Sequence, residues 1–324
     1  MKIGILLTNL GTPDSPTEPD LKRYLKEFLS DPRVIDPPNK LIWFLVLNLI
    51  ILRKRPKQSA KNYAKIWDSF GMGSPLLNIT QSQLDGVKAQ LEKTNNNLEF
   101  EIGMRYGNPS ISSALEKLYQ KKCEKVVVLP LYPQKSGPTT RSTLDTVQAK
   151  FNTWETPPKL EFVEQYHQDG GYIQALANSI TEHQKKFGKP DKLIMSYHGM
   201  PKRYVDNGDI YYQHCLETSK QLAKTLDLND DDYIISFQSV FGKEEWIKPY
   251  TDATLKSLPK QGVKHVQVIC PGFSADCLET IEEIDQENRA YFLNSGGREF
   301  SYIAALNDRD DHIQALSNII SRYL

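Results

Sequence analysis

Two short stretches constrain the fold of this chain more than any other part of its sequence. Residues 192–201 (KLIMSYHGMP) and residues 266–284 (VQVICPGFSADCLETIEEI) each begin as an apolar run and then change abruptly to Gly, Pro and reactive side chains. A buried parallel strand that delivers a functional loop at its carboxyl end has this pattern. The chain is therefore predicted to contain a parallel α/β sheet with chemistry at its carboxyl edge.

One imidazole and several carboxylates stand at these two predicted strand ends. His198 closes the first stretch, and the second carries Asp276, Glu279 and Glu283. The two glutamates are four residues apart at the start of a predicted helix, so their carboxylates share one face. Such a group can move protons, bind a divalent metal, or do both.

Each motif also has a structural interpretation. A histidine at a strand end often serves only as a hydrogen-bonding partner, and an acidic first turn simply complements the helix dipole. The convergence of both motifs at strand ends in one half of the chain favours a functional site. The remaining histidines have no comparable setting and are predicted to be structural or to lie on the surface: His167, His183, His214, His265 and His312.

The two halves of the chain repeat one order of elements. Strands are predicted at 2–9, 98–104 and 126–129 and again at 192–196, 233–237 and 266–270. The second and third strands are about 30 residues apart in both halves, the size of one βαβ unit. A length of 324 residues suits two α/β domains. We predict an N-terminal domain over 1–150, a C-terminal domain over 151–306, and a final helix over 307–324 that packs back on the N-terminal domain.

An apolar insertion distinguishes the first half from the second. It spans 36–58, and its segment 41–52 (LIWFLVLNLIIL) is followed at once by the basic run 53–57 (RKRPK). The segment is shorter than the roughly 20 apolar residues of a membrane-spanning helix. A buried helix with a solvated basic end is one interpretation. The position of the segment on a duplicated scaffold favours the other, a functional lip that contacts a membrane interface.

Charge and cysteine content exclude several classes of protein. Lys plus Arg equals Asp plus Glu at 40 each, so no net charge attracts nucleic acid. The four cysteines are too few and too scattered for a disulfide framework, and the first residues lack the features of a secretory leader. We expect a cytoplasmic location.

Familiar catalytic motifs are missing from the sequence. No G-x-G-x-x-G follows the first predicted strand, and neither a G-x-S-x-G elbow nor an H-E-x-x-H pair is present. Cys270 and Cys277 are seven residues apart with no second pair, which is a weak signal for a zinc or iron–sulfur site. Nucleotide binding on the Rossmann pattern, serine hydrolysis and zinc proteolysis are thus disfavoured.

Eight blocks of sequence, in order along nearly the whole chain, resemble the ferrochelatase family. They are NLGTP at 9–13, FLSDP at 28–32, GSP at 73–75, MRYG at 104–107, LPLYPQ at 129–134, SYHGMP at 196–201, FQSVFGKEEW at 237–246 and CPGFSADCLET at 270–280. The resemblance implies two similar Rossmann-like domains, each a four-stranded parallel sheet flanked by helices, with a porphyrin in the cleft between them.

The resemblance also implies roles for particular residues. The family's histidine falls on His198 and its essential glutamate on Glu279, as catalytic and metal-contacting groups, while Asp276 and Glu283 continue the acidic side as a proton relay or metal path. The expected porphyrin contacts are Leu10, Arg55, Arg105, Tyr106, Tyr132, Ser136 and Trp246. Arg55 matches a basic residue near the lip that meets a propionate.

The implied reaction is insertion of Fe(II) into protoporphyrin IX to give protohaem with release of two protons, the last step of haem biosynthesis. Leu10 stands where members that metallate coproporphyrin usually carry Tyr, which favours protoporphyrin. No C-terminal cysteine cluster is present, so we expect no [2Fe-2S] centre and no permanently bound cofactor. The alternatives are a porphyrin or haem carrier on the same fold, or a coproporphyrin or cobalt chelatase. We also expect peripheral contact of residues 41–55 with the inner face of the cytoplasmic membrane.

Overall fold

The computed structural model describes residues 1–37 and 39–324; Pro38, inside the predicted insertion, lies outside the described residues. The chain forms two compact units. The first comprises residues 1–165 and 316–324, and the second comprises residues 166–315.

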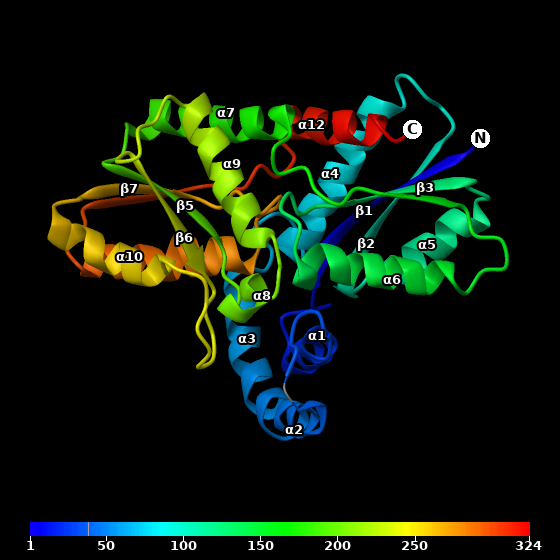
Figure 1. The fold of residues 1–324 in the computed structure, drawn as a ribbon, viewed down its shortest axis with the longest axis horizontal. Helices are drawn as coiled ribbons and strands as arrows, with labels where there is room; N and C mark the ends of the chain where they lie inside the picture. The colour runs from blue at the N-terminus through cyan, green and yellow to red at the C-terminus, as the bar shows by residue number, and fades with distance from the viewer. Residues whose placement is uncertain (38) are drawn as a thin grey trace. The chain divides into compact units, whose positions relative to one another are not determined.

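The first unit is built on a parallel sheet of strand order β2-β1-β3-β4. Its strands are β1 (Ile3–Thr12), β2 (Leu98–Gly107), β3 (Lys125–Pro130) and β4 (Lys159–Phe162). The apolar runs of β1 and β3 are buried on both faces, as central parallel strands require. Helices α5 (Ile111–Gln120) and α6 (Ser142–Phe151) pack on the sheet through a common apolar cluster (Figure 1).

The second unit repeats this design with strand order β6-β5-β7-β8. Its strands are β5 (Lys192–His198), β6 (Tyr233–Gln238), β7 (His265–Ile269) and β8 (Glu299–Ile303). An apolar cluster joins the sheet to α10 (Thr251–Ser257), the π-helix η4 (Glu279–Asn288) and α11 (Arg289–Asn294).

The remaining helices of the described residues connect or cover these elements. They are α1 (Glu18–Leu29), α2 (Lys40–Val46), η1 (Leu47–Ile51), α3 (Leu52–Ile66), α4 (Pro75–Leu91), η2 (Gly137–Arg141), α7 (Gly170–Phe187), α8 (Lys202–Asp206), α9 (Tyr211–Thr225), η3 (Leu258–Gln261) and α12 (Asp310–Ser321).

The prediction of two α/β units with one strand order is confirmed by the two sheets. Two strands, β4 and β8, had no prediction of their own. The division of the chain also differs from the expected boundary at residue 150. Because β4 pairs with β3, residues 151–165 complete the first sheet and group with the first unit.

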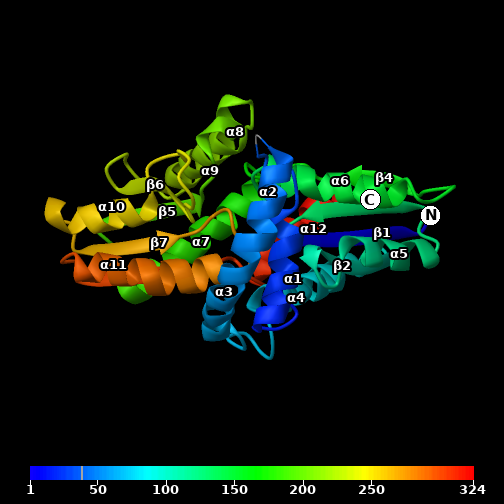
Figure 2. The ribbon, with the colours of Figure 1, turned by 90° about the horizontal axis from the view of Figure 1, so that it is seen from below.

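The predicted lip is helical from Lys40 to Ile66, as α2, the π-helical turn η1 and α3. Asn39 caps its start by accepting the backbone N–H groups of Leu41 and Ile42. Figure 2 shows α2 and α3 beside α1. On the inner side Leu47 and Leu52 are buried. The exposed apolar side chains of the lip are Leu41, Ile42, Phe44, Leu45, Leu49 and Ile50.

Among the described residues, no helix has the length and apolar character needed to cross a membrane.

Glycine permits the close contact of β1 and β2 at their carboxyl ends. Gly11 has φ +110°, and a Cβ there would lie 1.7 Å from the carbonyl oxygen of Tyr106. Gly107 has φ +80°, and its Cβ would meet the carbonyl of Thr12 at 2.5 Å. Only glycine adopts both the backbone angle and the approach without strain, which explains the Gly at each strand end.

The second unit contains a buried histidine whose ionisation opposes folding. His312 has no exposed surface; its Nδ1 donates to the carbonyl of Asn307 at 2.7 Å, and its Nε2 has no partner among the described residues. Burial, helped by the charge of Arg309, lowers the pKa of His312 to about 4, although Asn307 and Asp311 act in the opposite direction. The neutral ring is therefore the folded form.

We predict that His312 makes the second unit less stable in mild acid. In the unfolded chain His312 binds a proton near pH 6.5, and in the folded chain only near pH 4. The free energy of unfolding is therefore highest above about pH 6.5 and falls by about 3 kcal/mol as the pH drops through this window. Thermal unfolding of the wild type and His312→Asn between pH 7.5 and 4.5 measures the effect. The variant should lose less stability on acidification; parallel curves for the two proteins would contradict the assignment.

Candidate active site

His198 lies at the carboxyl end of the central strand β5, opposite Gln238 of β6 in the register. Its Nδ1 is 2.6 Å from the carbonyl oxygen of Gly199. A carbonyl can only accept, so Nδ1 carries the proton and the neutral ring keeps its lone pair on Nε2. Tyr211 of α9 donates to the backbone carbonyl of His198 at 3.0 Å. The local chain thus fixes both the tautomer and the backbone of this histidine.

Gln238 joins the strand ends to the start of η4. The side chain is 2% exposed. Its oxygen accepts from Ser196 of β5 at 2.8 Å, and its nitrogen donates to the backbone carbonyl of Glu279 at 2.7 Å. The first residue of η4 is thereby held at the end of β6. The sequence places Gln238 at a strand end, but the pattern assigns it no role.

Ser239 donates two hydrogen bonds to the carboxylate of Glu283. Its backbone N–H lies 2.6 Å from Oε1 and its hydroxyl 2.5 Å from Oε2. Ser239 has φ +64°, a left-handed conformation uncommon for a residue with a side chain. Such strain is typical of functional loops. This residue, too, had no role in the sequence analysis, although the QSVFG block after a predicted strand was the available signal.

His198 pairs in register with Gln238, which holds the backbone of Glu279, and the next residue, Ser239, holds Glu283; we name His198, Glu279 and Glu283 the strand-end cluster. Burial raises the pKa of Glu283, and the negative charge of Glu279 raises it further. The Ser239 donors, and His198 when it is protonated, act against this rise. A carboxyl with a raised pKa can exchange a proton nearer neutral pH than an ordinary glutamate.

Asp276 has a different setting from the one expected. Its carboxylate is buried and accepts from Thr280 at 2.9 Å, Tyr302 at 2.7 Å and the Asn307 amide at 2.7 Å, with the Ala305 N–H at 3.3 Å. These donors occupy both of its oxygens. The structure therefore supports an anchoring role for Asp276, which holds the start of η4 to the segment after β8, over the predicted proton or metal path.

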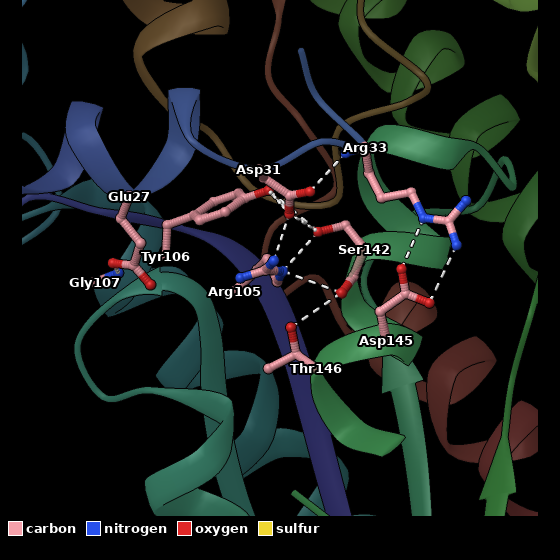
Figure 3. Close-up of polar contacts among 9 residues, drawn as sticks. All are labelled: Glu27, Asp31, Arg33, Arg105, Tyr106, Gly107, Ser142, Asp145 and Thr146. Atoms are coloured by element: carbon pink, nitrogen blue, oxygen red, sulfur yellow. Dashed lines mark hydrogen bonds and ion pairs between the residues drawn. The ribbon is translucent and has the colours of Figure 1, made fainter. Parts of the chain in front are cut away.

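In the first unit, Arg105 and Tyr106 meet the carboxylate of Asp31 (Figure 3). Arg105 pairs with Asp31, and the Tyr106 hydroxyl donates to it at 2.8 Å. Ser142 of α6 donates to the same oxygen at 2.5 Å. Burial alone would raise the pKa of Asp31, but these donors and the Arg105 charge lower it.

Tyr106, which is predicted to contact the porphyrin, is buried in the structure. The ring has no exposed surface and packs edge-on against Phe28 at 5.1 Å between centroids. It therefore has no face to offer a macrocycle. The network with Asp31 instead fixes the end of α1, from which the chain continues into the lip.

The other predicted porphyrin contacts differ in exposure. Leu10 and Tyr132 are half-buried, and Arg55 is exposed on α3. Ser136 is buried, and its hydroxyl caps η2 by accepting the backbone N–H of Thr139 at 3.3 Å. Its hydroxyl thus has a structural partner.

Trp246 packs beside the strand-end cluster. Its ring centroid lies 6.4 Å from that of His198, and only 3% of the residue is exposed. Gly199 leaves room for it, because a Cβ there would approach the indole at 3.0 Å. Phe241, which is 38% exposed, packs edge-on against Trp246 at 4.9 Å. The accessible aromatic surface is therefore that of Phe241, which the sequence analysis did not single out.

Solved structures define the fold class. SirB from Bacillus subtilis with Fe3+ matches 99% of this chain and 95% of its own, with a TM-score of 0.55 and 13% identity. The sirohydrochlorin chelatase SirB from Bacillus subtilis subspecies spizizenii, in complex with cobalt, matches with a TM-score of 0.56 and 11% identity over the same shares. At these identities the likeness shows the fold alone, which is that of the chelatases.

Sequence comparison defines the family within this class. The family model described as Ferrochelatase matches residues 2–324. Curated relatives named Ferrochelatase include one from Hydrogenovibrio crunogenus, 59% identical over 98% of this chain and 85% of the relative, and one from Idiomarina loihiensis, 52% identical over 100% and 88%. Ferrochelatase 2 of Shewanella oneidensis is 48% identical over 100% and 98%. The chain belongs to the ferrochelatase family, whose members are lyases that insert iron into a porphyrin.

We predict that Ser239→Ala shifts the pH dependence of metal insertion. Loss of the hydroxyl removes one donor that favours ionised Glu283, so the pKa of that carboxyl rises further and the acidic limb of the kcat/KM profile moves to higher pH. Initial rates between pH 5.5 and 9 measure the shift. Ser257→Ala in α10 serves as the matched control and should keep the wild-type limb. If the acidic limb of the kcat/KM profile is the same in Ser239→Ala as in the wild type, Glu283 does not titrate in the rate-determining steps.

Proposed function

We propose that this chain inserts Fe(II) into protoporphyrin IX to form protohaem, with release of two protons. The observation that supports the proposal is the strand-end cluster: His198 at the end of β5 donates from Nδ1 to Gly199, while Gln238 and Ser239 hold Glu279 and Glu283 of η4 at the end of β6. The reaction needs a group that accepts pyrrole protons and groups that receive a partly dehydrated metal.

His198 is the proton acceptor in this proposal. Its Nδ1–H is engaged by Gly199, so the lone pair on Nε2 is the basic atom. Each pyrrole N–H bond breaks as its proton passes to a base, and its electron pair becomes available to iron. A neutral imidazole also suits Fe(II) as a transient ligand.

In the next step of the proposed reaction, Glu279 and Glu283 bind the metal or accept a proton. Glu279 ligates the incoming iron or takes a proton onward, and Glu283 is the second acceptor because its raised pKa allows protonation. The Ser239 donors keep the Glu283 carboxylate oriented. Asp276 anchors the start of η4 and takes no part in transfer.

The proposed contacts with the macrocycle are assigned residue by residue. We assign apolar contact to Leu10 and Tyr132, aromatic contact to Phe241 backed by Trp246, and a propionate to the exposed Arg55. Arg105, Tyr106 and Ser136 act as supports, because their polar atoms already have protein partners. Leu10 favours protoporphyrin over coproporphyrin.

The lip is the proposed membrane contact. Its exposed leucines and isoleucines adjoin the exposed Arg53, Lys54, Arg55 and Lys57. Apolar side chains beside a basic cluster suit the interface of an anionic bilayer. This proposal places the protein in the cytoplasm, at the inner face of the membrane.

We further propose that the enzyme carries no [2Fe-2S] centre. Cys123, Cys215, Cys270 and Cys277 are all buried. Burial raises the pKa of the last three thiols, which disfavours the thiolates that such a cluster needs.

Anaerobic incubation of the pure protein with protoporphyrin IX and Fe(II) tests the proposed reaction. Absorbance should change to that of haem with many turnovers per enzyme. A carrier would bind the porphyrin without turnover. Coproporphyrin and sirohydrochlorin, assayed in parallel, should react more slowly; faster reaction with either would move the assignment to that substrate.

We predict that Glu279→Gln and His198→Ala abolish insertion while porphyrin still binds. Loss of a general base or a metal-contacting carboxylate costs 10²–10⁴-fold in rate, whereas porphyrin affinity measured by fluorescence quenching should change by less than about threefold. Glu287→Gln, an exposed position on the same π-helix, is the control. Wild-type turnover in Glu279→Gln would remove that residue from the mechanism. If His198→Ala lowers only the porphyrin affinity, this residue holds the porphyrin and does not accept its protons.

We predict that Leu45→Ser/Leu49→Ser/Ile50→Ser weakens binding to anionic vesicles at least 10-fold, because each exposed side chain contributes about 2 kcal/mol when buried in lipid. Leu47 is left unchanged because it is buried against the helix α1 residue Leu29. Flotation with phosphatidylglycerol vesicles measures the effect. Leu293→Ser, at an exposed position on α11, is the control. Equal binding of the triple variant and the wild type would return the lip to a purely structural role.

A further inference from the structure

A second group of metal-ligand side chains lies in the second unit, outside the strand-end cluster. His167 precedes α7, and His214 and Glu217 lie on α9. One ligand atom from each of the three lies within 4.8 Å of the other two. The sequence analysis predicted both histidines to be structural or on the surface, because nothing in their spacing shows that the fold brings them together.

The two imidazoles are buried and stacked. Their ring centroids are 3.7 Å apart with an interplanar angle of 10°, and His167 and His214 are 4% and 6% exposed. Nitrogen lone pairs lie in the ring planes, so parallel rings at this distance present donors side by side. Two nitrogens on a tetrahedral Zn²⁺ are roughly 3.3 Å apart. Coordination of one ion by both rings therefore requires the side chains to rotate out of this stacked arrangement.

Glu217 supplies the third donor at the same place. Its Oε2 is 2.8 Å from His167 Nε2, and the amides of Gln168 and Gln213 donate to its two oxygens at 2.6 and 3.0 Å. His214 and Glu217 are three residues apart on α9, so they share one helix face, the spacing found in metal-binding helix bundles. Outer donors of this kind hold ligating carboxylates in place.

The present contacts leave His167 half satisfied. Its Nε2 is paired with Glu217, but its Nδ1 is buried and has no hydrogen-bond partner among the described residues. A buried ring nitrogen without a partner costs free energy. The backbone is well held, because the hydroxyl of Thr218 lies 3.1 Å from the carbonyl oxygen of His167 and 2.9 Å from that of His214. The side chain of His167 therefore keeps one ring nitrogen that a ligand could pair.

We propose that His167, His214 and Glu217 form a second site for a divalent transition metal. Two imidazoles and one carboxylate suit Zn²⁺, Co²⁺ or Fe²⁺, and the set leaves a coordination position for water. Tyr211, which holds the backbone of His198, lies one turn before His214 on the same helix. The site is independent of the proposed role of the strand-end cluster.

Binding of Co²⁺ to the full chain tests the proposal. The His198→Ala/Glu279→Gln background removes metal binding at the strand-end cluster, so any remaining equivalent reports the second site. We expect one equivalent with a visible d–d band of a four- or five-coordinate ion, and a raised Tm with Zn²⁺. Adding Glu217→Gln or, separately, His167→Gln should weaken this binding at least 10-fold.

Glu299→Gln provides the matched control, because Glu299 pairs with His265 at 3.7 Å and the two belong to no group of three ligands among the described residues; it should leave Co²⁺ binding unchanged. Circular dichroism confirms that each variant is folded, and Glu217→Gln keeps the volume of a half-exposed side chain. The proposal is overturned if the background protein binds no Co²⁺, or if both folded variants bind it as the background does.

Discussion

The buried amide of Gln238 is the contact on which the arrangement of the strand-end cluster depends. It accepts from Ser196 on β5 and donates to the backbone of Glu279, so one side chain ties the central strand, its neighbour and the start of η4. Loss of either bond would leave a buried polar group unsatisfied, at about 1–3 kcal/mol. The spacing between the histidine and the carboxylates of this ferrochelatase family member is thereby set by the interior of the sheet.

The sequence predicted those features that follow from strand polarity and apolar periodicity. Continuous apolar runs marked β1, β3, β5 and β7, and the change to Gly and Pro marked their carboxyl ends, where His198 and Glu279 lie. Short or alternating strands were harder to recognise: β4 reads KLEF, with two charges in four residues. Its place in the first sheet comes from pairing with β3, a tertiary contact that local pattern does not encode.

Side-chain roles were predicted less well, because they depend on which partner a residue meets. Tyr106 and Asp276 stand at strand ends as expected, yet packing turns the first against Phe28 and surrounds the second with donors. Leu47 lies in an apolar run whose other members are mostly exposed, and only the helix phase buries it. His167 and His214 are 47 positions apart in the sequence and come together only in the fold.

Because η4 is a π-helix, the number of residues in it affects where its acidic side chains lie. In this geometry the hydrogen bonds run to the fifth residue, so each turn holds more residues than an α-helix. Removing one residue from Glu279–Asn288 would let part of the segment tighten to an α-helix and would change the angles between its side chains. An in-frame deletion that kept every acidic side chain would still misdirect them. The segment therefore tolerates exchange of residues more readily than any change in their number.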